Sequence, residues 1–210
     1  MYIPAAFSQP DKHALFDLVE RHAFGLLLSS AGGMTGSHVP FLLDRARGDS
    51  GTLLCHLAAA NPQATLVEGQ EVLCIFQGAH GYISPTWYAK KPAVPTWNYQ
   101  AVHAYGTART TREPAVLRAL VERLTAGYEG PAGWKLADEP ESFAAGLLRG
   151  IVGIEIAVTR LEGKFKLSQN RPSADVDGAI AHLRNLGDEG NLALADAMVA
   201  ATSPAPSRHA

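Results

Sequence analysis

The stretch from residue 76 to residue 106 most constrains the fold, because it combines strong strand formers with prolines. It holds two tryptophans, four tyrosines and two histidines, together with Pro85, Pro92 and Pro95. Aromatic residues favour strands, whereas proline lacks the backbone N–H and is confined to strand ends, edges and bulges. The stretch therefore predicts strands over 81–88 and 96–107, separated by a pause, with flat rings and polar tips on their surface.

Length and composition predict one globular domain. A chain of 210 residues with 47% hydrophobic content can bury a sizeable core without disulfide bonds. We therefore expect a single domain over residues 1–190. The last segment, residues 199–210, is small, polar and proline-bearing, which is typical of a disordered tail.

Charge and hydropathy narrow the function class. Lys and Arg total 18 against 20 Asp and Glu, so the formal charge of −2 gives no electrostatic footprint for nucleic acid. DNA stays open as a partner that the charge does not support. No uncharged apolar run approaches the ~20 residues of a membrane helix, and no signal peptide is apparent. Cys55 and Cys74 lie in apolar runs, which is typical of reduced core thiols in a cytoplasmic protein.

Turn residues and hydrophobic periodicity predict alternating helices and strands in the first part of the chain. Ser8, followed three residues later by Asp11, predicts a helix start, and this helix should end near Arg21. Strands are expected over 24–30 and 37–44, joined by a glycine-rich turn. Further expected elements are a strand over 52–56, a short helix over 57–67 and a strand over 72–77.

The second half predicts three helices around one strand. One helix opens at Pro114 and closes near Gly127 and Gly130. Helices over 141–149 and 175–186 flank a strand over 151–160. Five or six short antiparallel strands with helices between them predict an α+β fold, either a small barrel or an open sheet covered by helices.

Six segments of the chain, in order, resemble one known family. They are MYIP at the start, SHVPFLL (37–43), CHLAAANPQ (55–63), EVLCIFQGAHGYISPTWY (71–88), VPTWNYQAVHAYG (94–106) and EGKFKLSQNR (162–171). Together they resemble the PaiB family of FMN-binding split-barrel proteins, often called negative transcriptional regulators. The resemblance covers nearly the whole chain, and strings such as YISPTWY and VPTWNY rarely arise by chance.

The resemblance implies a six-stranded antiparallel split β-barrel with peripheral helices. It also implies a homodimer with FMN at the subunit interface, as in related pyridoxamine-phosphate-oxidase-like flavoproteins. The family name implies a negative transcriptional regulator or a ligand-sensing dimer. The alternative is a flavin-dependent oxidoreductase acting on a small molecule, in which the flavin carries the electrons.

Other function classes lack support in the residues. No helix-turn-helix or strongly basic recognition helix is apparent, so repression would act through a protein partner or through metabolism. Nucleophile-elbow, Walker and Rossmann patterns are also absent from the sequence. The histidines and cysteines show no close paired spacing, so we expect no metal site.

Ten side chains are expected to contact the cofactor: Ser37, His38, His56, Asn61, Tyr88, Tyr99, Lys164, Lys166, Ser168 and Gln169. His56 and Asn61 flank an expected helix N-terminus, where free N–H groups suit a phosphate. The family usually has an arginine where this chain has Ala59. Because a hydrogen bond to a charged group contributes about 1.5–3 kcal/mol, FMN binding is expected to be weakened at this position.

The other members of this set have competing interpretations. Lys164, Lys166 and the neighbouring Arg171 supply donors that compensate for the missing arginine, or else they belong to a solvated turn. His38 and His56 are proton donors, ring-edge partners or structural residues. The aromatic side chains divide between the two roles: Tyr88 and Tyr99 are expected at the ligand, and Trp87 and Trp97 in packing.

Overall fold

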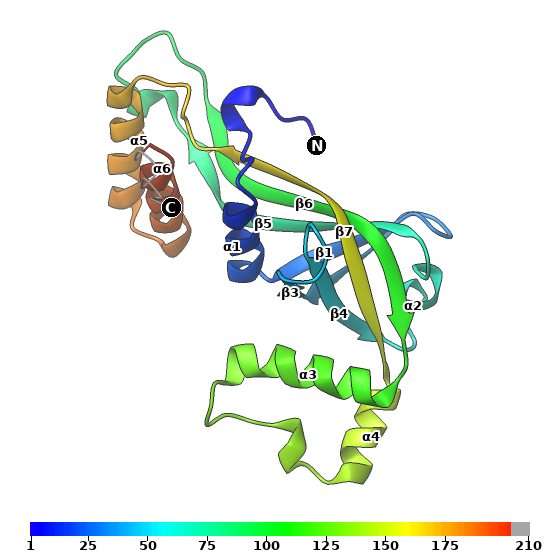
Figure 1. The fold of residues 1–210 in the computed structure, drawn as a ribbon. Coiled ribbons are helices and arrows are strands. Elements are labelled where there is room, and N and C mark those ends of the chain that lie inside the picture. The colour runs from blue at the N-terminus through cyan, green and yellow to red at the C-terminus, as the bar shows by residue number, and fades with distance from the viewer. Residues whose placement is uncertain (203–210) are drawn as a thin grey trace, which may run out of the picture. The chain divides into compact units, whose positions relative to one another are not determined.

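A computed structural model describes residues 1–202 as a seven-stranded sheet with helices, an α+β fold (Figure 1). The strand order is β2-β1-β5-β6-β7-β4-β3, one strand more than the six expected. The strands are β1 (Phe24–Ser29), β2 (Thr35–Pro40), β3 (Leu42–Asp44), β4 (Thr52–Ala58), β5 (Glu71–Ile83), β6 (Thr96–Thr111) and β7 (Ile151–Lys166). The helices are α1 (Lys12–Arg21), α2 (Gln63–Leu66), α3 (Pro114–Glu129), α4 (Glu141–Arg149), α5 (Ser173–Leu186) and α6 (Glu189–Thr202).

The chain divides into two compact units, and the three long strands pass through both. Unit 1 consists of residues 1–10, 77–101 and 163 onward. Unit 2 consists of residues 11–76 and 102–162. Each unit therefore draws on segments that are far apart in the sequence.

A β-hairpin forms one edge of the sheet in unit 2, as the glycine-rich turn predicts. β1 pairs antiparallel with β2, and Leu26 lies opposite His38 in the register. The strand expected over 37–44 is wrong as one piece, because it breaks at Phe41 into β2 and β3. Phe41 donates its N–H to the carbonyl of Ala23 and packs its ring edge-on against Phe76 at 5.2 Å. The break follows Pro40, which cannot donate a ladder hydrogen bond.

Helix α1 ends at Arg21 as expected but begins later than Ser8. Its N-cap is Asp11, whose carboxylate accepts a hydrogen bond from the His13 N–H at 2.9 Å. Ser8 instead forms a β-bridge with Lys164 in unit 1. Asp11 is the N-cap rather than Ser8 because a carboxylate both accepts hydrogen bonds from the free N–H groups and complements the helix dipole.

The helix expected over 57–67 is wrong in its start. β4 continues to Ala58, and α2 comprises only Gln63–Leu66. Its first N–H groups are already bonded: the Gln63 N–H donates to the Asn61 side chain, and the Ala64 N–H donates to the Asn61 carbonyl. Such a short and satisfied turn offers no free helix N-terminus to a phosphate, so that part of the expectation is corrected.

Three strands are longer than predicted. The apolar run over 72–77 and the aromatic run that follows merge into the single strand β5, and β6 extends to Thr111. β7 extends six residues beyond Arg160, to Lys166. The strand predicted up to Tyr88 ends at Ile83, because Pro85–Trp87 form a 3₁₀ turn capped by Ser84. Lys164 and Lys166, for which a solvated turn was one of two interpretations, lie on β7.

Between β6 and β7, unit 2 carries α3 and α4, whose bounds agree closely with prediction. Pro114 occupies the first turn of α3, Gly130 follows its last residue, and α4 is Glu141–Arg149 as expected. The two helices are joined over a small core of Leu117, Leu136, Ala144 and Leu148. Because α3 and α4 bury their apolar residues against each other in a cluster of their own, local periodicity predicted the bounds of both helices well.

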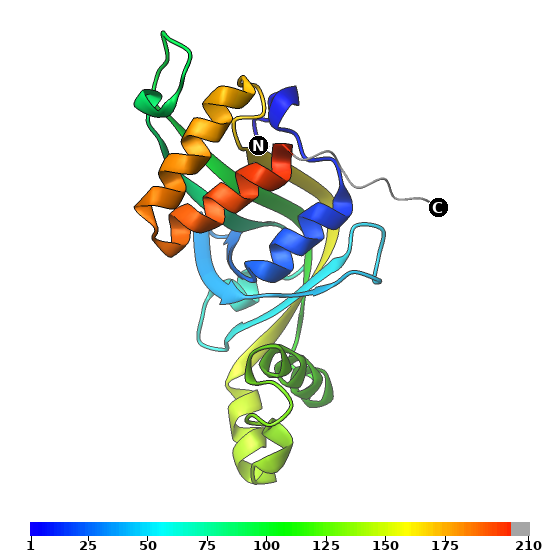
Figure 2. The same cartoon turned by 90° about the vertical axis from the view of Figure 1, so that its left-hand side faces the viewer.

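Helices α5 and α6 lie side by side in unit 1 across the strands of that unit (Figure 2). Ile83, Leu167, Val176, Leu183 and Met198 belong to their common core. Helix α5 approaches the Pro85–Trp87 turn so closely that a Cβ added to Gly178 would lie 2.3 Å from the Trp87 carbonyl oxygen. Only glycine fits at such a contact.

Helix α6 corrects the expectation for the C-terminal segment. It begins after Asp188, whose carboxylate accepts the Asn191 N–H at 3.0 Å, and its Leu194, Ala195 and Met198 are buried. Residues 199–202, expected in the tail, belong to this helix. The remainder of the expected tail, residues 203–210, lies outside the described residues.

None of the helices described over residues 1–202 combines the length and the apolar character that crossing a membrane requires.

Candidate functional site

Five side chains gather on one face of the strands in unit 1, which we call the aromatic–cationic face. Strand residues alternate between two faces. Phe165 packs against the α5–α6 core, so Lys164 and Lys166 on either side of it lie on the opposite face of β7. In β6, Asn98 is buried beside Met198 of α6, which places its neighbours Trp97 and Tyr99 on the same face as the two lysines, opposite the α5–α6 core. The face consists of Tyr82, Trp97, Tyr99, Lys164 and Lys166.

Both lysines are held in place by aromatic rings and backbone carbonyls. The Lys164 Nζ lies 5.4 Å from the centroid of the Tyr99 ring and 5.6 Å from that of Tyr2, and it donates to the Tyr2 carbonyl at 3.1 Å. The Lys166 Nζ donates to the Thr96 hydroxyl and to the Trp97 carbonyl. Cation–π contacts and backbone acceptors orient the two ammonium groups without neutralising them.

The charge of this lysine pair is not balanced by a carboxylate. Within residues 1–202, no Asp or Glu forms an ion pair with Lys164 or Lys166, while the nearby Arg171 is 3.9 Å from Asp175. Burial lowers the pKa of Lys166, and the positive charges of Lys164 and Arg171 lower it further. Like charges held together disfavour their own charged forms, so an anion bound here would relieve the repulsion.

Two aromatic members of the face, Tyr82 and Trp97, are exposed and arranged at an angle to each other. Tyr82 and Trp97 form an edge-to-face pair with centroids 6.3 Å apart, and their exposed fractions are 46% and 56%. Exposed rings of this size on a folded surface are typical of contact sites. Trp97 was expected in packing, whereas half of its surface is free in the described chain.

Three of the predicted cofactor residues in unit 1 point into the protein instead. Ser168 is buried and accepts a hydrogen bond from the Asn98 side chain at 2.9 Å. The Gln169 side chain bonds the end of β7 and the residue after it, accepting from the Leu167 N–H at 2.7 Å and donating to the Phe165 carbonyl. Tyr88 is 3% exposed, and its ring lies 4.5 Å from the Arg171 guanidinium. The structure brings Tyr99, Lys164 and Lys166 together on the aromatic–cationic face. It separates Ser168, Gln169 and Tyr88 from that face.

In unit 2, Ser37 and Asn61 meet in a closed hydrogen-bond network around Gln63. The Ser37 hydroxyl donates to the Gln63 side-chain oxygen at 2.6 Å, and the Asn61 amide donates to Ser37 at 3.1 Å. The Gln63 amide is fully buried and donates to the Leu27 carbonyl, the Ser29 hydroxyl and the Thr35 carbonyl. These polar groups hold α2 against the β1–β2 hairpin.

The two predicted histidines of unit 2 lie apart from this network. His38 follows Ser37 on β2, so its side chain projects to the other face, where it stacks on the exposed Phe24 ring with centroids 6.2 Å apart. His56 lies on β4 opposite Gly153, and its Nδ1 is buried without a hydrogen-bond partner among the described residues. Burial lowers the pKa of His56, so its imidazole is neutral at pH 7.

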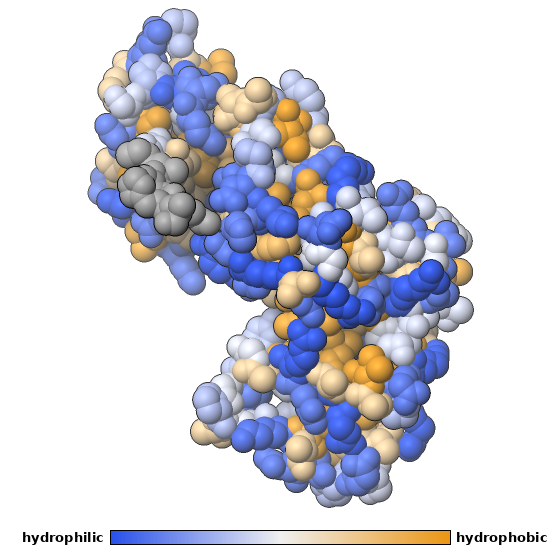
Figure 3. Space-filling model, in the orientation of Figure 1, coloured by the Kyte–Doolittle hydropathy of each residue, from blue (hydrophilic) through white to orange (hydrophobic). Residues whose placement is uncertain are grey.

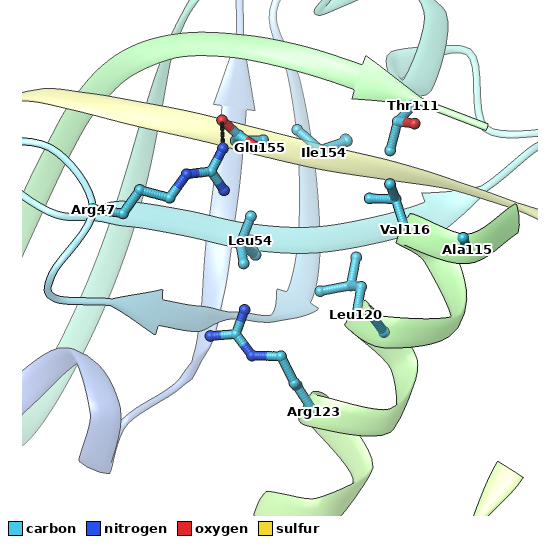
Figure 4. Close-up of a pocket in the computed structure, with 11 residues that line it drawn as sticks. Arg47, Leu54, Thr111, Ala115, Val116, Leu120, Arg123, Ile154 and Glu155 are labelled. Carbon is cyan, nitrogen blue, oxygen red and sulfur yellow. Dashed lines mark hydrogen bonds and ion pairs between the residues drawn. The ribbon is translucent and has the colours of Figure 1, made fainter. Parts of the chain in front are cut away.

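A pocket beside α3 was missed from the sequence, because no single segment carries it. We call it the α3 pocket. It has a volume of about 350 Å³, and Figure 3 shows hydrophobic residues gathered where α3 faces the strands. Leu54 of β4, Ile154 of β7 and the side chains of α3 line it (Figure 4). The complete lining set is Arg47, Leu54, Thr111, Ala115, Val116, Ala119, Leu120, Arg123, Gly153, Ile154 and Glu155.

Two arginines from different elements reach into the α3 pocket (Figure 4). Arg47, in the loop before β4, forms an ion pair with Glu155 at 2.5 Å. Arg123 of α3 lies 3.7 Å from Asp44. The only sequence signal for this site is an amphipathic helix that carries small residues and an arginine on one face. That signal is not enough, because the strands that face the helix lie far away in the chain.

No group of three or more His, Cys, Asp or Glu residues in the described part of the chain is arranged to hold a metal ion.

Comparison with known proteins assigns the family. Residues 1–160 match the family model described as "Putative FMN-binding domain". The protease synthase and sporulation protein PAI 2 of Bacillus subtilis is 34% identical over 191 residues, covering 88% of this chain and 90% of the relative. An uncharacterized protein of Emericella nidulans is 32% identical over 241 residues, covering 93% of this chain and 95% of the relative.

Solved structures confirm the split-barrel fold expected from the resemblance. The flavocytochrome Anf3 of Azotobacter vinelandii superposes with a TM-score of 0.61 at 13% identity, covering 76% of this chain and 69% of that one. The FAD and heme binding protein of Mycobacterium smegmatis gives a TM-score of 0.59 at 13% identity, covering 82% and 79%. At this identity the likeness concerns the fold alone.

Proposed function

Because this chain belongs to the family of FMN-binding domains, we propose that it binds FMN on the aromatic–cationic face and serves as a ligand-sensing regulator. The observation that carries the proposal is the pair Lys164 and Lys166, two cations on one strand face with no carboxylate in ion-pair contact within the described residues. FMN joins a flat three-ring system to a phosphate. Exposed rings beside uncompensated cations fit both parts of that ligand.

Lys166 is the proposed main phosphate partner. Its Nζ is half-buried and fixed by Thr96 and the Trp97 carbonyl, so little side-chain freedom would be lost on binding. A hydrogen bond to a charged group contributes about 1.5–3 kcal/mol, the size of the contribution expected from the arginine that Ala59 replaces. The lysine pair therefore supports phosphate binding in a chain that lacks this arginine.

The exposed aromatic residues also support a homodimer. Tyr82 and Trp97 are 46% and 56% exposed within one chain, and the aliphatic Val94 is 68% exposed. Large rings of this kind act as anchors when a partner surface covers them. Light scattering after size exclusion, with and without FMN, measures the subunit count; a monomer under both conditions contradicts this part of the proposal.

A regulatory role is supported by the similarity to PAI 2, whose name places that protein in protease synthesis and sporulation. The formal charge of −2 offers little nonspecific attraction to DNA, so we propose that regulation acts through a partner rather than through direct operator binding. The two free, fully buried cysteines fit the reducing cytoplasm that we propose as its location. When bound, FMN supplies one- and two-electron redox chemistry.

Titration of the protein with FMN and with riboflavin tests the ligand. Riboflavin has the same ring system but no phosphate, so the affinity difference between the two isolates the contribution of the phosphate. We expect saturable FMN binding, seen as quenched flavin fluorescence, and weaker riboflavin binding. Absence of binding by either flavin contradicts the proposal.

Lys166→Gln tests the residue. This variant should weaken FMN binding about 10- to 100-fold and leave riboflavin binding nearly unchanged, because only the phosphate contact is lost. Lys135→Gln is the matched control, since Lys135 is exposed and lies in unit 2. An equal loss for both flavins would show that Lys166 shapes the ring site and does not contact the phosphate.

The same preparation separates a sensor from an oxidoreductase. An oxidoreductase driven by a pyridine nucleotide should show anaerobic bleaching of the bound flavin by NADH or NADPH, and recovery of the visible spectrum in air. A sensor should keep its flavin spectrum with both donors. A salt-sensitive gel shift at low protein concentration would replace partner-mediated regulation with direct DNA binding.

A further inference from the structure

We propose that the α3 pocket binds a small organic acid, a compact apolar body that carries one carboxylate. The inference goes beyond FMN binding and does not depend on it, because every residue that lines the pocket belongs to unit 2. It assigns to this chain a second ligand, of the kind that a sensor would respond to.

The interior of the pocket fits an apolar body of limited size. Leu54, Ile154, Val116 and Leu120 supply aliphatic surface from two strands and one helix. The volume of about 350 Å³ lies near the lower end of the range of roughly 300–1,000 Å³ for ligand pockets. A single ring with a short side chain fits this space better than a multi-ring ligand does.

Small residues keep the pocket open, and a close contact closes one end of it. Ala115 and Ala119 on α3 leave room where longer side chains would fill the space. At the closed end, a Cβ added to Gly153 would lie 2.9 Å from Thr111 and 3.0 Å from the Leu117 side chain. The strand and helix therefore touch there and diverge toward the two arginines.

Both arginines at the open end keep N–H donors beyond the carboxylates that they already contact, Glu155 and Asp44. Arg123 makes no hydrogen bond within the described residues, and its ion pair with Asp44 spans 3.7 Å. Arg47 uses one terminal nitrogen for Glu155 and is 50% exposed. Each guanidinium has five N–H donors in a planar fork that matches the two oxygens of a carboxylate. The donors that these two contacts leave over are available to a ligand whose apolar part lies against Leu54, which Figure 4 draws between the two arginine side chains.

Fluorine NMR with para-fluorophenylacetate tests this assignment in the flavin-free chain of 210 residues. The acid should bind saturably, and its neutral amide, para-fluorophenylacetamide, should bind at least about ten-fold more weakly, because the amide lacks the negative charge and the second acceptor oxygen that a carboxylate offers to a guanidinium. Equal binding of acid and amide, or no binding of the acid, overturns the proposal.

Three variants place the ligand. Arg123→Gln should weaken acid binding by about ten-fold or more and change amide binding little. Ala119→Leu fills the pocket and should abolish binding of both compounds, whereas Arg112→Gln, at an exposed arginine outside the pocket, should change neither. Circular dichroism confirms that each variant is folded. Acid binding that survives Ala119→Leu in a folded protein shows that the acid binds elsewhere.

Two further measurements separate this inference from the FMN proposal. Lys166→Gln should leave acid binding unchanged, so loss of FMN binding in that variant does not affect the result here. Added FMN should not displace the fluorinated acid. Displacement would make the α3 pocket part of the flavin site and would overturn the inference of a second ligand.

Discussion

The polar groups around Gln63 in unit 2 and the lysine pair in unit 1 were predicted alike as parts of one ligand site, yet the structure treats them in opposite ways. Ser37, Asn61 and Gln63 bond to one another and to the β1–β2 hairpin. Lys164 and Lys166 are oriented by rings and carbonyls, and their charge has no carboxylate in ion-pair contact within residues 1–202. One set is satisfied by the protein, and the other is the set that we propose for the ligand.

This difference provides a criterion for choosing site residues. A buried hydrogen-bonding group whose partners are internal contributes to stability, and removing it leaves those partners unsatisfied. When a cation lies beside other cations, their repulsion disfavours its charged form, and a bound anion relieves that repulsion. The first kind should be detected by unfolding experiments and the second by ligand titration.

The largest expected effect is on the network in unit 2. Gln63→Leu removes a fully buried amide that serves Ser37, Ser29 and two carbonyls. Because these partners stay buried without it, the free energy of unfolding should fall by about 3 kcal/mol or more, measured in urea. Gln70→Leu, at an exposed glutamine of the same unit, is the control and should change stability by at most about 0.5 kcal/mol. A loss below about 1 kcal/mol for Gln63→Leu would remove the contrast.

A companion variant, for which almost no effect on stability is expected, sharpens the contrast from the other side. Lys166→Gln should cost the flavin-free protein no more than about 0.5 kcal/mol of unfolding free energy. The reason is that burial and the cationic neighbours disfavour the charged form of Lys166 and lower its pKa, so removing this charge takes away little stabilisation. Urea unfolding without FMN measures this value. A loss as large as that of Gln63→Leu would make Lys166 a structural residue.

A smaller effect separates ring contacts from phosphate contacts. Trp97→Ala removes an exposed ring that pairs edge-on with Tyr82. Aromatic pairs contribute about 0.5–1.5 kcal/mol beyond area burial, so FMN and riboflavin should both bind about 2- to 10-fold more weakly. Fluorescence titration of the two flavins gives the ratio. A loss confined to FMN would place the phosphate, and not the ring, near Trp97.

The smallest expected effect concerns pH and the stability of unit 2. Burial lowers the pKa of His56 in the folded protein, so the His56 imidazole binds a proton more readily in the unfolded chain than in the folded chain. Stability is therefore complete above the usual imidazole pKa and falls as the pH drops below it, by at most about 1.4 kcal/mol per pH unit for one group. His56→Gln should flatten the pH dependence of unfolding between pH 7 and pH 5. An unchanged slope would assign the acid sensitivity to other histidines.

The sequence determined the elements whose signals are local. The bounds of α4, the proline at the start of α3 and the hairpin after β1 followed from turn residues and periodicity, and the family resemblance identified the fold. It did not identify α6, whose Leu194, Ala195 and Met198 belong to the α5–α6 core. Ala and Leu dominate this helix and favour it locally, but the small, polar and proline-bearing residues at the end of the chain led to a tail being predicted from residue 199.

Only the tertiary structure decided which polar residues remain available. Ser37 is satisfied by Gln63, 26 residues away, and Ser168 by Asn98, 70 residues away. The α3 pocket likewise joins Arg47, Leu54 and Arg123 from three separate elements. Periodicity reports the face on which a side chain lies, because it depends on neighbours along the chain. Whether a donor or a charge on that face is satisfied depends on groups that only folding brings near.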